Sequence, residues 1–147
     1  MAEAMTGGCA CGKVRFTARV GNDEAYLCHC RMCQRATGSI SIAFKNLLKS
    51  DVTWDAEPDW YQSSPIARRP YCAACGASLG FEFPDSEKMD LTVAAFDDPS
   101  HFRPVHHFGT ESAHRAWFNM EGLTEYRTDE SQVLVDRWLK ATGKMPD

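Results

Sequence analysis

The sequence predicts a mainly β protein built from short antiparallel strands, with an α-helix at the C-terminal end. Three observations lead to this prediction. Short segments in which apolar and polar residues alternate recur along the chain, and such alternation is typical of strands with one buried face. Turn-forming residues such as glycine and proline separate these segments. Only the last part of the chain has the apolar spacing of a longer amphipathic helix.

The alternating segments define eight expected strands. In chain order they span residues 13–20, 24–28, 39–44, 52–54, 60–62, 66–71, 78–83 and 89–96. Glu57-Pro58 and Ser63-Ser64-Pro65 supply turns between three of them, and Pro84-Asp85-Ser86 separates the last two. One or two helical turns fit residues 31–36, because Thr37-Gly38 follows as a stop signal.

The C-terminal helix is expected over about residues 129–142. Asp129 is an N-cap residue type with Gln132 three positions on, and Gly143 follows as a stop. The apolar residues spaced four apart are Leu134 with Trp138 and Val135 with Leu139. Such a stripe usually faces a core, so we expect this helix to cover the sheet.

The bulk properties favour one folded domain over residues 1–147, with a core over about residues 7–125. Hydrophobic residues make up 44% and charged residues 24% of the 147 residues, which is typical of a globular protein. The net charge of -4 argues against a nucleic-acid partner, which would require a basic face. No apolar run could span a bilayer, and Met1 to Gly8 lacks the features of a signal peptide. We therefore expect no membrane partner and a cytoplasmic location.

The seven cysteines are the strongest functional signal. Thiols stay reduced in the cytoplasm, where clustered cysteines indicate metal binding or catalysis more often than disulfides. Cys9 and Cys11 form a C-x-C pair, and Cys72 and Cys75 form a C-x-x-C pair, each followed by glycine. Together they can supply the four thiolates of a tetrahedral structural zinc site. A redox role for the C-x-x-C pair is the alternative.

The other three cysteines, Cys28, Cys30 and Cys33, lie within six residues as C-x-C-x-x-C. Three protein ligands and one exchangeable position are the arrangement of a catalytic zinc, so these residues predict a second, open zinc site. In the alternative, an acid or a histidine closes the site and both zincs are structural. The candidate histidines are His29, His101, His106, His107 and His114. His29 is the least suited of them, because neighbouring side chains of an extended segment point to opposite sides.

With these motifs in place, the sequence resembles the family of glutathione-dependent formaldehyde-activating enzymes and centromere protein V. The resemblance runs from about residue 7 to residue 125. Its motifs are Gly7-Gly8-Cys9-Ala10-Cys11-Gly12, Cys28-His29-Cys30-Arg31-Met32-Cys33 with Ala36-Thr37-Gly38, Tyr61-Gln62-Ser63-Ser64-Pro65, Arg69-Pro70-Tyr71-Cys72-Ala73-Ala74-Cys75-Gly76, and His107-Phe108-Gly109-Thr110-Glu111-Ser112. Gln34, where the family is often basic, Tyr71, where phenylalanine is common, and the C-terminal helix depart from the family pattern.

The resemblance implies a β-tent fold braced by zinc on Cys9, Cys11, Cys72 and Cys75, with a second zinc on the other three cysteines. It also implies a carbon–sulfur lyase that adds glutathione or a similar small thiol to formaldehyde. The alternative function is a non-catalytic zinc module that binds a thiol compound or a protein partner. The catalytic residues cannot be assigned beyond the open zinc site itself. Arg35 and Arg69 are the candidates for binding the carboxylates of the substrate, and His107 and Glu111 are candidates for proton transfer.

Overall fold

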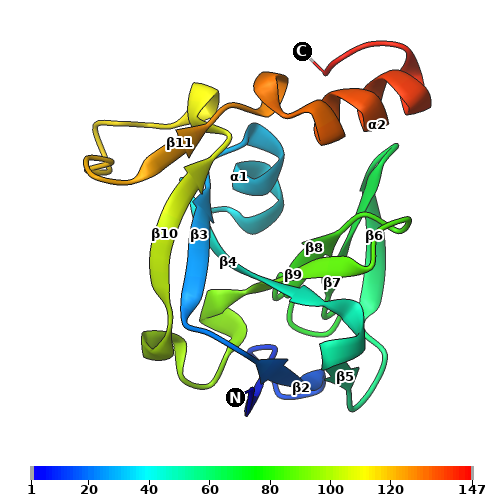
Figure 1. The fold of residues 1–147 in the computed structure, drawn as a ribbon. Coiled ribbons are helices and arrows are strands. Elements are labelled where there is room, and N and C mark those ends of the chain that lie inside the picture. The colour runs from blue at the N-terminus through cyan, green and yellow to red at the C-terminus, as the bar shows by residue number, and fades with distance from the viewer. Residues whose placement is uncertain (1, 147) are drawn as a thin grey trace.

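The computed structural model describes residues 2–146, which form a mainly β fold with two α-helices, one of them at the C-terminal end. The predicted fold class is therefore confirmed. The strands make a three-stranded and an eight-stranded sheet. In Figure 1, β3 and β10 run along one side of the molecule, β6 to β9 lie on the other, and the small sheet lies at the base.

The small sheet is antiparallel, with the order β1–β2–β5. Its strands are β1 (Glu3–Gly8), β2 (Arg15–Val20) and β5 (Val52–Trp54). We did not predict β1, whose sequence EAMTGG ends in two glycines and has little intrinsic β propensity. Pairing with β2 along the whole length of β1 stabilises the extended conformation, which the local sequence does not favour.

The large sheet has the order β11–β10–β3–β4–β9–β8–β7–β6. In chain order its strands are β3 (Glu24–Cys28), β4 (Ile42–Leu48), β6 (Asp59–Ser64), β7 (Ala67–Tyr71), β8 (Gly80–Glu82), β9 (Lys88–Thr92), β10 (Arg103–Phe108) and β11 (Thr124–Tyr126). The expected strand over residues 89–96 ends at Thr92, because a 3-10 turn follows. The expected strand over residues 39–44 lies later, in β4.

Most pairs in the large sheet are antiparallel, but β10 runs parallel to both β3 and β11. We predicted neither β10 nor β11. Pro104 lies in β10, and the register with β3 shifts between Pro104 and His106, so the segment lacks a regular strand pattern. Parallel strands end at the same edge of a sheet, and Phe108 therefore lies beside Cys28. This places the end of β10 at the three-cysteine motif.

The main core lies between the small sheet and β9. Phe16 on β2 packs edge-on against Trp54 and Phe96, with ring centroids 5.6 and 5.1 Å apart. Leu91 on β9 is fully buried in the same cluster. Burying such side chains stabilises the fold by about 1.5–3 kcal/mol each. The core therefore holds the strands that flank the cysteine loops.

The two α-helices are α1 (Arg31–Thr37) and α2 (Gln132–Thr142). Short 3-10 turns span Lys49–Asp51, Val93–Ala95, Pro99–His101, Thr110–Ser112 and Thr128–Glu130. No helix in residues 2–146 combines the length and the hydropathy of a membrane-spanning segment.

The C-terminal helix begins later than the sequence suggested. Asp129 accepts two hydrogen bonds from Arg127, and α2 begins after Ser131. Gly143 ends the helix in the left-handed conformation, as its position predicted. Of the expected apolar face, Trp138 is buried but Leu139 is 47% exposed. The helix therefore does not lie across the sheet as expected: it packs mainly on the 3-10 turn Thr128–Glu130, and Arg137 reaches Phe83 and Asp85.

Candidate metal centres

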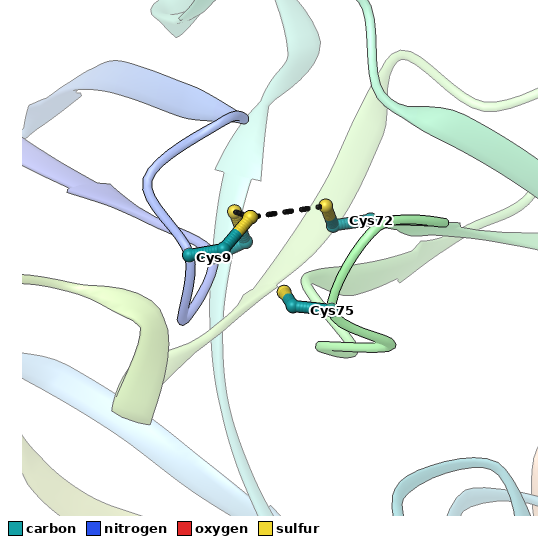
Figure 2. A group of neighbouring side chains, drawn as sticks. Cys9, Cys72 and Cys75 are labelled. Atoms are coloured by element: carbon teal, nitrogen blue, oxygen red, sulfur yellow. Dashed lines mark hydrogen bonds between the residues drawn. The ribbon is translucent and has the colours of Figure 1, made fainter.

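The first cluster brings together Cys9, Cys11, Cys72 and Cys75, whose sulfurs all lie within 4.8 Å of one another. In Figure 2 the labelled cysteines reach toward one another from two loops, one after β1 and the other after β7. The sulfur of Cys11 lies 3.6 Å from that of Cys9 and 3.8 Å from that of Cys72. Four sulfurs at about 2.3 Å from one ion are about 3.8 Å apart in a tetrahedron. The donor set and its spacing therefore fit a tetrahedral zinc.

Each loop is shaped by its own backbone. The Val14 N–H donates to the sulfur of Cys9 at 3.2 Å, and the Cys9 N–H donates to the carbonyl of Val14 at 2.9 Å. In the second loop the Gly76 N–H donates to the carbonyl of Cys72 at 2.7 Å, and Gly76 has a φ of 77° that favours glycine. The Val14 N–H and the neighbouring thiols lower the pKa of Cys9 to about 6, although burial acts to raise this pKa. A thiolate, the form that binds metal, is thus favoured at this position.

The second cluster consists of Cys28, Cys30 and Cys33, whose sulfurs also lie within 4.8 Å of one another. Cys28 ends β3, Cys30 is the N-cap of α1, and Cys33 lies in the first turn of that helix. The Cys33 N–H donates to the sulfur of Cys30 at 3.3 Å. The Cys28 and Cys33 thiols hold the pKa of Cys30 well below its ordinary value, against the effect of burial. Among the described residues, no histidine or acid joins this cluster.

The strand β10 holds this cysteine turn from one side. The His29 N–H donates to the carbonyl of Phe108 at 2.8 Å. Gly109 has a φ of 68°, and a Cβ added there would lie 2.9 Å from the backbone nitrogen of Cys30. Only glycine allows the chain to turn and to approach Cys30 so closely. The sequence motif around Gly109 signals this contact, but only the fold shows what it touches.

The histidines considered as a fourth ligand have other partners. His29 is fully buried, and its Nε2 lies 2.8 Å from Nδ1 of His107. His106 stacks on Tyr26, and Nε2 of His114 lies 3.3 Å from the side-chain oxygen of Gln34. His101 lies in the 3-10 turn before β10. As predicted, the ring of His29 is not grouped with the sulfurs of its neighbours.

Gln34 is a positioning residue that the sequence did not identify. Its amide nitrogen donates to the carbonyl of His29 at 2.6 Å and to the carbonyl of Ser112 at 3.1 Å. Its oxygen accepts a hydrogen bond from Arg31 at 2.6 Å. Gln34 is also buried. It therefore ties α1 to the cysteine turn and to the loop after β10.

The candidate substrate-binding and proton-transfer residues lie in different settings. Arg35 is exposed on α1, whereas Arg69 is 3% exposed and donates from Nη2 to the sulfur of Cys33 at 3.4 Å. Glu111 accepts a hydrogen bond from the backbone of Thr128, and His107 is buried against His29. Of the four, the structure brings only Arg69 into contact with a cysteine of the cluster.

Two surface cavities lie apart from the three-cysteine cluster. One of about 620 Å³ is formed by β6, β7, the loop after β8 and α2, and includes Arg68 and Arg137. The other, of about 480 Å³, is formed by the loop after β1 and the segment around Ala95, and includes Cys9. Neither is lined by Cys28, Cys30 or Cys33.

A mainly β fold with one four-cysteine and one three-cysteine cluster defines a class of cysteine-rich proteins with two candidate metal sites. The sequence profile of the glutathione-dependent formaldehyde-activating enzyme family matches residues 4–112. The chain belongs to this family. The match ends before β11 and α2, which lie outside the shared region.

The similar proteins include a curated relative and a solved structure. An uncharacterized lyase of Schizosaccharomyces pombe is 30% identical over 77 residues, which are 52% of this chain and 56% of that protein. The chain thus spans little more than half the length of this curated relative. The crystal structure of a Rhodobacter sphaeroides protein superimposes with a TM-score of 0.53 at 25% identity, over 63% of this chain and 88% of that one.

Proposed function

We propose that this chain is a zinc-dependent carbon–sulfur lyase-type enzyme that adds a small thiol, such as glutathione, to formaldehyde or acts on a related adduct. The observation that carries the proposal is the three-cysteine cluster. Its three sulfurs lie close together, and among the described residues no histidine or acid joins them as a fourth ligand. Family membership supports glutathione and formaldehyde as the substrate class. The similarity to a protein named as a lyase supports the reaction class.

Two zinc ions per chain fit the two donor sets. Cys9, Cys11, Cys72 and Cys75 would hold a structural ion, and Cys28, Cys30 and Cys33 would hold the second. When bound at the three-cysteine site, zinc would lower the pKa of a substrate thiol that binds as its fourth ligand. That thiol would then be a thiolate nucleophile at neutral pH. A reducing compartment such as the cytoplasm would keep all seven cysteines as the free thiols that the structure shows.

The chain holds the three sulfur ligands in place and leaves one of the three cysteines partly accessible. Cys28 and Cys33 are buried, whereas Cys30 is partly exposed, so an incoming thiol approaches from the side of Cys30. The exposed Arg35 lies on the same short helix as Cys33. We assign to Arg35 the binding of a substrate carboxylate, which guanidinium groups pair with in a bidentate manner.

A zinc module that binds a thiol or a protein partner without turnover is the second candidate. It is favoured by one observation, that two of the three sulfur-bearing residues, Cys28 and Cys33, are buried and only Cys30 is partly exposed. The site of such a module would need only an exchangeable ligand position, without room for a whole substrate.

A rate measurement separates the two functions. Exchange between formaldehyde, glutathione and their adduct is followed by NMR, because the spontaneous reaction also runs and must be subtracted. The control is Cys30→Ser, which removes one sulfur from the cluster. An enzyme accelerates the exchange above the rate with Cys30→Ser at equal concentration. Equal rates together with thiol binding by the wild type would instead support the binding module.

A further inference from the structure

Arg68 and Arg69 are neighbours on β7 but face opposite sides of the sheet. Arg68 stacks over Trp60 at 3.9 Å and pairs with Glu82 at 2.6 Å. Arg69 points the other way, where its guanidinium stacks over Phe81 at 4.8 Å. One strand thus presents one arginine to a carboxylate and the other to the three-cysteine cluster.

The burial of Arg69 requires a compensating negative charge. Only 3% of the residue is exposed, and an isolated buried charge costs several kcal/mol. Among the described residues, Arg69 forms no salt bridge, and its Nε and Nη1 have no hydrogen-bond partner. Its one polar contact at hydrogen-bond distance is the sulfur of Cys33, 3.4 Å from Nη2. The thiolate of Cys33, which Arg69 contacts, supplies compensating charge, and the buried carboxylate of Asp90 lies within electrostatic range of the same guanidinium.

Arg69 offsets the net charge of the metal ion and its three thiolates. Three thiolates and one divalent ion leave one net negative charge in a buried cluster. The cation of Arg69 brings this sum to zero. When a thiolate then arrives as the fourth ligand, the site carries one negative charge instead of two. The four-cysteine cluster has less need of such a cation, because Cys11 and Cys75 are exposed to water.

We propose that Arg69 is the countercharge of the three-cysteine zinc site, and that it tunes the site to accept a thiolate as its fourth ligand. It is a positioning residue that acts through Cys33, and it does not bind the carboxylate of the substrate. This inference rests on the proposed occupancy of the cluster by zinc. It does not rest on turnover.

The test replaces zinc with cobalt(II), whose sulfur-to-metal absorption bands report on the thiolates, and titrates the protein with 2-mercaptoethanol. This thiol has no carboxylate, so any effect of Arg69 on a substrate carboxylate is removed. The variants are Arg69→Met, which removes the charge, and Arg69→Lys, which keeps it. Arg68→Met is the matched control on the opposite face of β7. Metal content is measured for each protein, so that loss of cobalt is distinguished from loss of thiol binding.

We expect Arg69→Met to bind 2-mercaptoethanol about tenfold more weakly, the lower end of what is usual when a metal ligand loses its hydrogen-bond partner. Its charge-transfer band should move to longer wavelength, because Cys33 loses a hydrogen bond that stabilises its lone pairs. Arg69→Lys should retain most of the affinity, and Arg68→Met should match the wild type. If Arg69→Met does not fold, Arg69→Gln takes its place as the uncharged variant.

The inference is overturned if the uncharged variant binds the thiol as tightly as the wild type with an unshifted band. It is also overturned if the lysine variant loses as much affinity as the uncharged one, because shape and not charge would then matter. Failure of the proposed enzyme function has a different signature. In that case the wild type would not accelerate adduct exchange, while its spectrum and thiol affinity would still depend on the charge at position 69.

Discussion

The rings of His29 and His107 lie 2.8 Å apart, Nε2 to Nδ1, and join the cysteine turn after β3 to the parallel strand β10. Both residues are at most 1% exposed. Burial lowers the pKa of each, so two neutral rings share this contact. The other ring nitrogens, Nδ1 of His29 and Nε2 of His107, have no hydrogen-bond partner among the described residues. The pair therefore adds a buried side-chain contact to the backbone pairing of β3 and β10 at the site.

Replacing His107 by phenylalanine should weaken this link and leave a buried donor or acceptor of His29 without a partner. We expect a loss of about 1–3 kcal/mol in the free energy of unfolding. Zinc should also leave the three-cysteine site faster in the presence of a colorimetric chelator. His101→Phe, in the turn before β10, is the control. Equal metal release and equal stability in the two variants would show that the histidine pair does not hold the cysteine turn.

The two cysteine clusters should respond differently to single substitutions. Cys72→Ser should unfold the protein, because Cys72 is fully buried in the core and a structural zinc contributes about 10–16 kcal/mol to folding, as much as a whole domain's stability. Cys30→Ser should release one zinc per chain and keep the fold. Metal analysis and thermal melting of both variants provide the measurement. A similar collapse of both proteins would contradict the division into a structural and a functional site.

Gly109→Ala should be costly for two reasons. The residue has a φ of 68°, and its new Cβ would approach the backbone nitrogen of Cys30 to 2.9 Å. Gly143→Ala is a matched control, because Gly143 has a φ of 75° but open space around the Cβ position. In urea unfolding, we expect Gly143→Ala to lower the free energy of unfolding by about 1 kcal/mol. Gly109→Ala should lower it by clearly more. Only Gly109→Ala should reduce zinc retention at the three-cysteine site. Equal costs would remove the argument from the Cys30 contact.

Asp90 should make the stability depend on pH. Burial raises the pKa of its carboxyl from 3.8 to about 6, although hydrogen bonds from Asn46 and Tyr26 act in the opposite direction. The folded state then holds the proton more tightly than the unfolded state. The resulting stability is complete below pH 3.8 and is lost as the pH rises through about 6.

Between pH 5 and pH 8 the wild type should therefore lose about 1.4 kcal/mol more of its unfolding free energy than Asp90→Asn. Urea unfolding of the zinc-loaded proteins at both pH values measures this difference. Asp55→Asn, at an exposed position, should follow the wild type. A parallel pH dependence of Asp90→Asn and the wild type would exclude the buried carboxyl as the cause.

The sequence by itself determined the fold class, most strands and the grouping of the cysteines by motif. These features depend on local patterns, namely the alternation of apolar residues and the spacing of two or three sulfurs within one turn. The strands at residues 24–28 and 52–54 have the expected bounds for this reason. The end of the last helix at Gly143 is also a local effect of one residue.

The tertiary structure determined which residues surround and support the three-cysteine cluster. β10 was missed because its order comes from a parallel partner about 80 residues earlier, and Pro104 interrupts its own pattern. The contact of His29 with His107 and the close approach of Gly109 to Cys30 follow from that pairing. The different surroundings of Arg68 and Arg69 likewise depend on which face of β7 lies toward the three-cysteine cluster. The sequence indicated the sulfurs of the three-cysteine cluster, whereas packing between distant segments determined its countercharge and its support.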